Sequence, residues 1–339
     1  MKKIKTSLLT LGATLIAASS LLAATAYMDP VGAVVVTCLG GPSDTRIALP
    51  FIQSPSFVGT VASVAGSDVT LTDAAFTPGE FDEVAGAAPV GHPVYYVMVN
   101  DGALEGGILD ITTNTADTVT VADSTAGLVA GDTVTITKHW TFADIVGGAT
   151  QTVIPDGSTV LLYDSTVAGI NKGAMGVWSF YDGFGWYDPS FNAADTQVLY
   201  VGESFIVRNS GAVASGDVDL VLAGNVPMNN TRLYVMSADG NDQDNYVGMM
   251  CPVGIPTIDT GLNVDDRDKI MIPANDVVGI NKGAKDIYDW YAGFNWYNNA
   301  FQVVDTTPPL PPGEGYIYRK TGQGAPATDT ALGTVPYNP

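Results

Sequence analysis

Cysteine and histidine are scarce in this chain, which has two of each among its 339 residues. None of the four stands in a Cys-x-x-Cys, His-x-x-x-His or His-Glu pattern, so the sequence gives no support to a zinc site. The Gly-x-Ser-x-Gly turn of serine hydrolases and a glycine-rich phosphate loop ahead of a helix are also missing. We therefore predict that the protein is not an enzyme.

Positive charge is scarce as well. The sequence has 14 Lys and Arg against 35 Asp and Glu, which gives a net charge of −21. Removal of a leader that carries three lysines would leave 11 basic residues against the same 35 acids, a net charge of −24. Such a polyanion excludes nucleic acid and anionic lipid as default partners.

Long apolar runs are missing after residue 26. No segment of the remaining chain is apolar over 18 positions. We therefore expect that the mature chain is not an integral membrane protein. Residues 1–26 have the pattern of a signal peptide, with a basic start at Lys2–Lys5, an apolar run from Leu8 to Ala18 and a small-x-small cleavage site at Ala24–Ala26. We expect an exported protein that is extracellular or at the cell surface, with the periplasm as the other location.

The helical period is almost absent after residue 26. Short runs rich in Val, Thr, Ile and Tyr recur instead, separated by Gly, Pro, Asn and Asp, for example at Val31–Leu39, Thr133–Thr137 and Thr231–Met236. Many short strands with frequent turn signals are typical of β-sandwiches and β-barrels.

An internal duplication is the strongest pattern that is present. Residues 167–187 and 277–297 are identical at 12 of 21 aligned positions, and both contain Gly-Ile-Asn-Lys-Gly-Ala. A similarity of this length indicates one structural unit used twice. It continues outside these segments, loosely between Asp44–Ile47 and Asp244–Val247 and more closely between Gly202–Arg208 and Gly313–Arg319.

We predict an all-β fold of two homologous β-sandwich-like units, the first interrupted by a small β-barrel-like insertion. The insertion is expected because the first unit holds an extra segment with strands and turns of its own. The predicted boundaries are a signal peptide at 1–26, a first unit at 27–56 plus 139–228, the insertion at 57–138 and a second unit at 229–339.

The order of the motifs resembles an uncharacterised family of exported bacterial all-β proteins. The resemblance rests on Asp29-Pro-Val-Gly, Tyr95–Val99, Gly102–Gly106 and Leu128–Asp132, followed by two aromatic hairpins, each trailed by a Phe/Tyr-Ile-x-Arg strand. It spans nearly the whole mature chain. It implies an exported protein with two aromatic-hairpin repeats and an inserted small β domain, and it brings no established activity.

The duplicated segments each predict an aromatic hairpin. Asp182-Gly183 and Ala292-Gly293 predict two-residue turns, which would pair Tyr181 with Phe184 and Ser179 with Trp186. Because side chains alternate between faces of a strand, one face would hold Tyr181, Phe184 and Trp186, and the other Trp178, Phe180 and Tyr187. In the second copy Tyr291, Phe294 and Trp296 would oppose Tyr288, Trp290 and Tyr297.

Three interpretations of these aromatic residues stay open. The first is that they are core, since each ring can bury about 150–250 Å². The second is a contact between subunits. The third is a stacking platform for glycans, with the candidate ligand-binding residues Trp178, Trp186, Tyr187, Trp290, Trp296 and Tyr297.

Two acidic clusters and the two cysteines complete the candidates. The clusters are solvated turns or calcium sites formed by Asp239, Asn241, Asp242, Asp244, Asp265, Asp266 and Asp268. No other cofactor is expected. Cys38 and Cys251 lie in apolar, strand-like runs and are either buried thiols or a disulfide, which export permits.

We predict a non-enzymatic structural or adhesive protein of the bacterial envelope or matrix. The alternative is a carbohydrate-binding module that uses the aromatic hairpins. The expected partners are further copies of the chain, in an oligomer or polymer joined through exposed edge strands and bridged by calcium, or an extracellular glycan.

Overall fold

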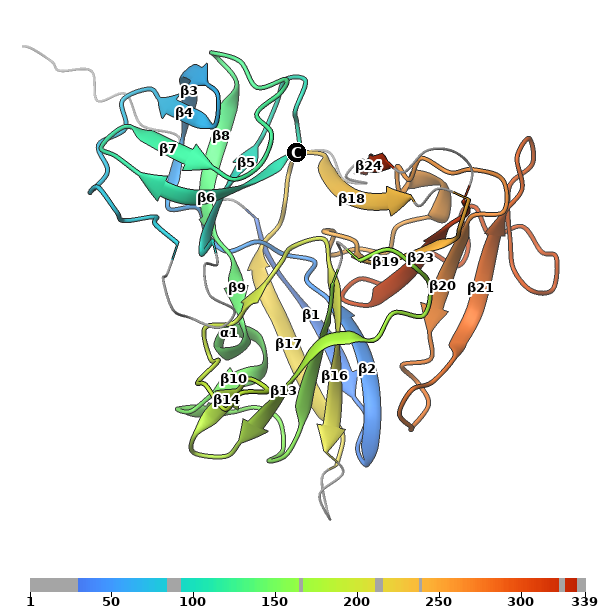
Figure 1. Cartoon of the computed structure of the whole chain (residues 1–339). Coiled ribbons are helices and arrows are strands. Elements are labelled where there is room, and N and C mark those ends of the chain that lie inside the picture. The colour runs from blue at the N-terminus through green and yellow to red at the C-terminus, as the bar shows by residue number, and fades with distance from the viewer. Residues whose placement is uncertain are drawn as a thin grey trace, which may run out of the picture.

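A computed structural model describes residues 30–83, 93–164, 167–210, 216–237, 240–322 and 327–333 (Figure 1). These residues form three β bodies: a barrel at the upper left of Figure 1, a first sandwich unit below it and a second unit to the right. The all-β class, with sheets and a closed six-stranded barrel, is confirmed. The predicted signal peptide lies outside the described residues.

The first unit places a five-stranded sheet against a two-stranded one. The order of the larger sheet is β14-β13-β12-β16-β2, and the smaller sheet pairs β1 with β17. All pairings are antiparallel. The strand bounds are β1 Val31–Cys38, β2 Pro42–Ala48, β12 Thr159–Tyr163, β13 Ala174–Tyr181, β14 Gly185–Tyr187, β16 Ser204–Ser210 and β17 Val218–Asn225.

The second unit has the same strand order. Its larger sheet runs β22-β21-β20-β23-β19, and β18 pairs with β24 beside it. Even the irregularities coincide, because β12–β13 and β20–β21 shift register at equivalent points, Leu162/Tyr163 and Ile272/Pro273. The strand bounds are β18 Thr231–Ser237, β19 Gln243–Gly248, β20 Lys269–Pro273, β21 Ala284–Trp290, β22 Trp296–Tyr297, β23 Gly315–Lys320 and β24 Ala327–Gly333.

The barrel closes in the order β3-β4-β7-β6-β5-β8. Its first and last strands pair with each other, and Ser56 N donates to Ile136 O at 2.8 Å just ahead of β3, so the chain enters and leaves at the same place. The strand bounds are β3 Phe57–Ala65, β4 Asp68–Leu71, β5 Tyr95–Val99, β6 Ile108–Asn114, β7 Thr118–Val121 and β8 Thr133–Lys138.

Each body has its own apolar core, and a fourth small cluster joins them. In each sandwich, alternate side chains of the two sheets meet, for example Leu220 and Val207 in the first unit and Val235 and Ile270 in the second. The fourth cluster contains Tyr96 and Met98 of the barrel, Val201 of the first unit and Met250 of the second. The barrel therefore packs on both units.

The remaining elements are short. They are β9 Trp140–Thr141 paired with β15 Val198–Leu199, the helix α1 Phe142–Val146, β10 Gly147–Gly148 paired with β11 Gln151–Thr152, and the 3-10 helix η1 Thr257–Asp259. Among the described residues, no helix is long and apolar enough to span a membrane.

Candidate functional site

The first aromatic hairpin differs from the predicted register by one residue. Phe180 pairs with Trp186, and Tyr181 pairs with Gly185. The turn has three residues, with Phe184 N donating to Tyr181 O at 2.9 Å and Gly185 at a φ of 94°. A three-residue loop is the next most common hairpin connection after the two-residue turn that Asp182-Gly183 suggested. The predicted pairing of Ser179 with Trp186 is therefore wrong.

The second hairpin has the same corrected register, because Trp290 pairs with Trp296 and Asp289 pairs with Tyr297. One residue of slip moves side chains to the opposite face. Trp186 thus lies with Phe180 instead of Tyr181, and Trp296 lies with Trp290 instead of Tyr291. The predicted composition of both faces is corrected accordingly.

The inward faces are core. Trp178, Trp186 and Trp296 are at most 4% exposed, and Trp186 Nε1 donates to Gly147 O at 2.7 Å. Trp290 is half-buried and packs against the core of the second unit. A ring enclosed by protein cannot stack on a sugar, so these three buried tryptophans do not form a glycan platform. Of the predicted platform, Tyr187 and Tyr297 remain on the outward faces.

The outward faces carry a second set of aromatic residues, which we call the aromatic ledges. The first ledge is Tyr181, Tyr187 and Phe191, whose ring centroids lie 5.7–6.4 Å apart. The second ledge is Tyr291, Tyr297 and Phe301, in which Tyr291 lies 5.7 Å from Tyr297 and 6.4 Å from Phe301.

The phenylalanines of the ledges and of the adjoining turns are held out in solvent. Phe191 and Phe301 are 73% and 74% exposed, and Phe184 and Phe294 at the turns are 72% and 71% exposed. Both copies therefore keep the same large apolar side chains at the same exposed positions. Large apolar patches that stay exposed mark interaction surfaces.

The backbone at each ledge phenylalanine is strained. Phe191 has a φ of 63° and Phe301 a φ of 56°, in the left-handed region that disfavours bulky residues. A tight loop imposes this conformation. Asp188 Oδ1 accepts from the backbone N of Ser190 and of Asn192, both at 2.8 Å, and Asn298 Oδ1 does the same in the second copy. The only sequence feature that indicated this loop is the recurrence of Phe191 at Phe301.

The acidic clusters are partly occupied by protein donors. Asp244 and Asp268 are fully buried. Asp244 forms an ion pair with Arg319, and Asp268 accepts hydrogen bonds from Asp265 N at 2.9 Å and Thr321 N at 2.6 Å. These two carboxylates are therefore structural acceptors, which corrects their assignment as calcium ligands.

The other members of the acidic clusters lie near the surface or outside the description. Asn241 and Asp242 are exposed, Asp265 pairs with Lys320 at 2.9 Å, and Asp266 Oδ1 accepts from Ala292 N. Asp239 lies outside the described residues. Within the described ranges, no group of three His, Cys, Asp or Glu side chains is placed to hold a metal ion.

No disulfide joins Cys38 and Cys251. Cys38 lies in the core of the first unit and Cys251 in that of the second, so the disulfide alternative is wrong. Burial raises the pKa of the Cys38 thiol to about 11, which keeps it protonated and unreactive.

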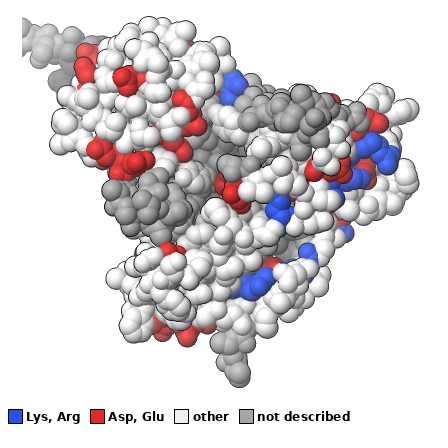
Figure 2. Space-filling model, in the orientation of Figure 1, with Lys and Arg blue, Asp and Glu red and all other residues white. Residues whose placement is uncertain are grey.

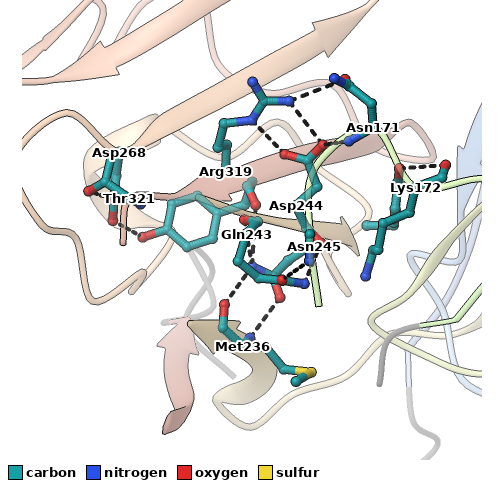
Figure 3. A network of polar contacts seen from close by, with 12 residues as sticks. Asn171, Lys172, Met236, Gln243, Asp244, Asn245, Asp268, Arg319 and Thr321 are labelled. Atoms are coloured by element: carbon teal, nitrogen blue, oxygen red, sulfur yellow. Dashed lines mark hydrogen bonds and ion pairs between the residues drawn. The ribbon is translucent and has the colours of Figure 1, made fainter. Parts of the chain in front are cut away.

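The duplicated Gly-Ile-Asn-Lys-Gly loops connect the two units. The loop of the first unit lies on β19, the edge strand of the second (Figure 3). Asp244 N donates to Gly169 O at 3.0 Å, and Asn171 N donates to Asp244 Oδ2 at 2.6 Å. Arg319 donates to both oxygens of Asp244 at 2.6 and 3.0 Å and to Asn171 Oδ1 at 3.3 Å.

The loop of the second unit makes the same contacts on β2, the edge strand of the first. Asp44 N donates to Gly279 O at 2.9 Å, and Asn281 N donates to Asp44 Oδ2 at 2.7 Å. Arg208 donates to both oxygens of Asp44 at 2.6 and 3.0 Å and to Asn281 Oδ1 at 3.1 Å. We call these two sets of contacts, centred on Asp44 and Asp244, the reciprocal clasp.

The reciprocal clasp explains several retained residues that sequence reasoning left without a role. Asn171 and Asn281 have φ values of 51° and 50°, a left-handed conformation that asparagine tolerates better than most residues. The clasp also covers the edge strands β2 and β19 at Asp44 and Asp244, so at these positions the two edges contact the other unit of the same chain. The recurrence of Asp44 at Asp244 and of Arg208 at Arg319 was the available signal.

No protein-family model matches the chain, and no curated protein sequence matches it as a relative. The family resemblance therefore stays a prediction, and function is argued below from the geometry alone.

Proposed function

We propose that this protein is a non-enzymatic structural or adhesive component of the bacterial envelope or matrix, exported by its leader. The observation that supports the proposal is the pair of aromatic ledges with their neighbouring turn phenylalanines. Four phenylalanines are more than 70% exposed at equivalent positions of the two units. Aromatic residues are enriched where proteins contact one another, because they bury a large area at low cost in side-chain entropy.

The first partner in this proposal is another copy of the chain. Each chain carries two ledges, so copies joined ledge to ledge can continue into an extended array. The net charge of −24 after leader removal opposes that assembly, and a divalent cation at exposed carboxylates such as Asp242 would reduce the repulsion more than monovalent salt does.

The test removes both ledge phenylalanines without disturbing the fold. In the variant Phe191→Asn/Phe301→Asn, asparagine tolerates the left-handed backbone that these loops impose. The matched control is Val129→Asn, which replaces an exposed apolar residue of the barrel. We expect wild type and control to self-associate in sedimentation at concentrations on the order of tens of micromolar, more strongly with calcium than with chelator. The ledge variant should stay monomeric, with a melting temperature at least as high as that of the wild type because asparagine relieves the backbone strain.

A strictly monomeric wild type in calcium and in chelator would contradict the assembly proposal. One observation then favours the glycan-binding alternative. Tyr181 and Phe191 are nearly parallel, with an interplanar angle of 28°, and together offer an outward aromatic surface. A glycan array would test this alternative, and its ligands should be lost in the Phe191→Asn/Phe301→Asn variant but kept in Val129→Asn.

A further inference from the structure

A cavity of about 340 Å³ lies between the two sandwich units, beside the reciprocal clasp. Its floor comes from the two five-stranded sheets. Ile206 stands beside Arg46 on neighbouring strands of the first sheet, and Ile317 stands between Tyr246 and Met271 in the second. These side chains point away from the sandwich cores, which hold their sequence neighbours Val207 and Tyr318. The volume lies within the usual range of small-molecule sites.

The charge of this cavity is opposite to that of the chain. Arg46, Lys172 and Lys282 line it. Asp44, the one acidic residue among the described lining residues, is already paired with Arg208. Figure 2 shows acidic side chains spread over the barrel, while the basic ones gather toward the two sandwich units. In a protein with 14 Lys and Arg against 35 acids, three basic side chains around one cavity are not expected from composition alone.

The two lysines are half-buried at the edge of the cavity, and Lys172 Nζ also lies 5.4 Å from the ring centroid of Tyr246. Lys172 Nζ donates to the backbone oxygens of Asp164 and Val167, both at 3.0 Å, and Lys282 Nζ donates to Val277 O at 2.5 Å. Burial lowers the pKa of both ammonium groups, although nearby carboxylates oppose the shift. Those carboxylates are Asp164, Asp244 and Glu203 around Lys172, and Asp44 and Asp276 around Lys282. An anion bound in the cavity would add a counter-charge near these half-buried ammonium groups.

The cavity wall also breaks the equivalence of the two units. Tyr163 stacks on Tyr246 with ring centroids 3.9 Å apart, and the Arg46 guanidinium lies 5.1 and 4.9 Å from the two rings. The second unit has Pro273 where the first has Tyr163, and Tyr246 where the first has Arg46. The clasp uses identical residues in both units and does not require this difference. The asymmetry instead gives the cavity one aromatic, cationic wall.

We infer that this cavity binds a small organic anion, a carboxylate held between Lys172 and Lys282 on a body whose apolar face packs against Ile206, Met271 and Ile317. The mixture of cations with aliphatic and aromatic walls fits an amphipathic anion better than a bare inorganic ion. An aryl acid and a sugar acid share this chemistry, because the C–H face of a pyranose is also apolar. The inference is independent of the aromatic ledges and of the proposed assembly.

The test is calorimetric titration of the wild-type protein with phenylacetate and with glucuronate, each compared with its neutral analogue, 2-phenylethanol or glucose. We expect one acid to bind at a single site, and we expect its neutral analogue to bind with an affinity at least roughly tenfold lower. Lys172→Met and Lys282→Met should each weaken binding of the acid by roughly tenfold as well. Lys285→Met is the matched control, because this exposed lysine pairs with Asp276 outside the cavity, and it should bind normally.

The arms of the experiment identify the source of the anion. Selective binding of phenylacetate indicates an aryl acid, and selective binding of glucuronate indicates a sugar acid. The inference is overturned if neither acid binds, if the neutral analogues bind equally well, or if sulfate alone binds as tightly as the acids. It is also overturned if Lys285→Met loses as much affinity as the cavity variants. Should a lysine variant fail to fold, the methyl NMR signals of Ile206, Met271 and Ile317 in the wild-type protein can be followed while the acids are added. Shifts confined to these methyl groups support the cavity as the binding site, and unchanged signals overturn the inference.

Discussion

At the scale of single residues, the hairpins divide their aromatic side chains between two roles. Trp186 and Trp296 are 0% and 2% exposed, whereas Phe184 and Phe294 are exposed by more than 70% a few positions away. Both kinds recur in both copies, so recurrence alone does not separate core from surface. The separation follows from the strand register, which decides on which face each ring lies.

Truncation of a buried tryptophan should be severely destabilising. We expect Trp186→Ala and Trp296→Ala each to lower the free energy of unfolding by about 3–5 kcal/mol, through lost burial and the cavity left behind. Urea denaturation measures this loss. The exposed neighbours supply the control, because Phe184→Ala and Phe294→Ala should change stability by less than about 0.5 kcal/mol. Equal losses in the two sets would show that the assigned hairpin register is wrong.

Glu314 should make the stability depend on pH. Burial raises the pKa of this carboxyl above its ordinary value, against the opposing hydrogen bond from Asn275 and the charge of Lys285. The folded state therefore holds the proton more tightly than the unfolded state. This contribution to stability is present below the ordinary pKa of 4.5 and is lost as the pH rises through the folded-state pKa.

Glu314→Gln removes that titration. We expect the melting temperature of the variant, relative to wild type, to increase between about pH 4 and about pH 7. Thermal unfolding followed by circular dichroism at several pH values measures the difference. A difference that stays constant across this range would show that Glu314 has an ordinary pKa in the folded protein.

At the scale of elements, the sequence predicted the kinds of structure better than their contacts. Period-two runs and turn residues predicted strands, the sandwich-and-barrel class and the existence of both hairpins. The hairpin register was missed because Asp182-Gly183 is a strong two-residue turn signal. The three-residue loop nevertheless forms in both copies, although Asn295 stands in the second where Gly185 stands in the first.

The reciprocal clasp was beyond prediction for a different reason. Asn171 contacts Asp244 across 73 positions, and Asn281 contacts Asp44 across 237 positions. Hydrophobic periodicity reports which face of an element is buried, and it contains no information on which distant element covers a loop. The duplicated loop therefore predicted a shared structure but not its partner.

Loss of either clasp carboxylate should destabilise the packing of the two units. Asp244→Asn leaves the Arg319 guanidinium, 16% exposed, without its counter-charge, and we expect a loss of about 3 kcal/mol. Asp44→Asn should cost less, because Arg208 is 26% exposed and water can solvate it better. Denaturant unfolding measures both. Asp276→Asn, in an exposed pair with Lys285, is the control and should leave the melting temperature unchanged. A reversed order would contradict this account of the clasp.

At the scale of the whole molecule, the barrel is an insertion whose ends meet, and its surface packs against both sandwich units. Ser56 bonds to Ile136, so residues 57–138 leave and rejoin the first unit at one point. Tyr96 and Met98 of the barrel are nonetheless fully buried against Val201 and Met250. The chain thus leaves and rejoins the first unit beside β3 and β8, while the packing of the barrel extends to both units.

Replacement of residues 57–138 by a short Gly-Ser bridge should leave both sandwich units folded. We expect a lower melting temperature, because Ile52, Val201 and Met250 lose their apolar neighbours. Near-ultraviolet circular dichroism reports the tryptophan environments of both cores. Complete unfolding of the deletion variant would show that the barrel is required for the sandwich core and that the predicted boundary is wrong.

The reciprocal clasp also makes this chain a candidate for domain swapping. Both halves of the clasp use the same contacts, so the first unit of one chain could close on the second unit of another without any new interface. Within one chain the short connection between β17 and β18 holds the units at an effective concentration on the order of millimolar, which favours the closed monomer. Partial destabilisation at high protein concentration would favour exchange. An open series of such exchanges would build a fibre whose every junction is already present inside the monomer.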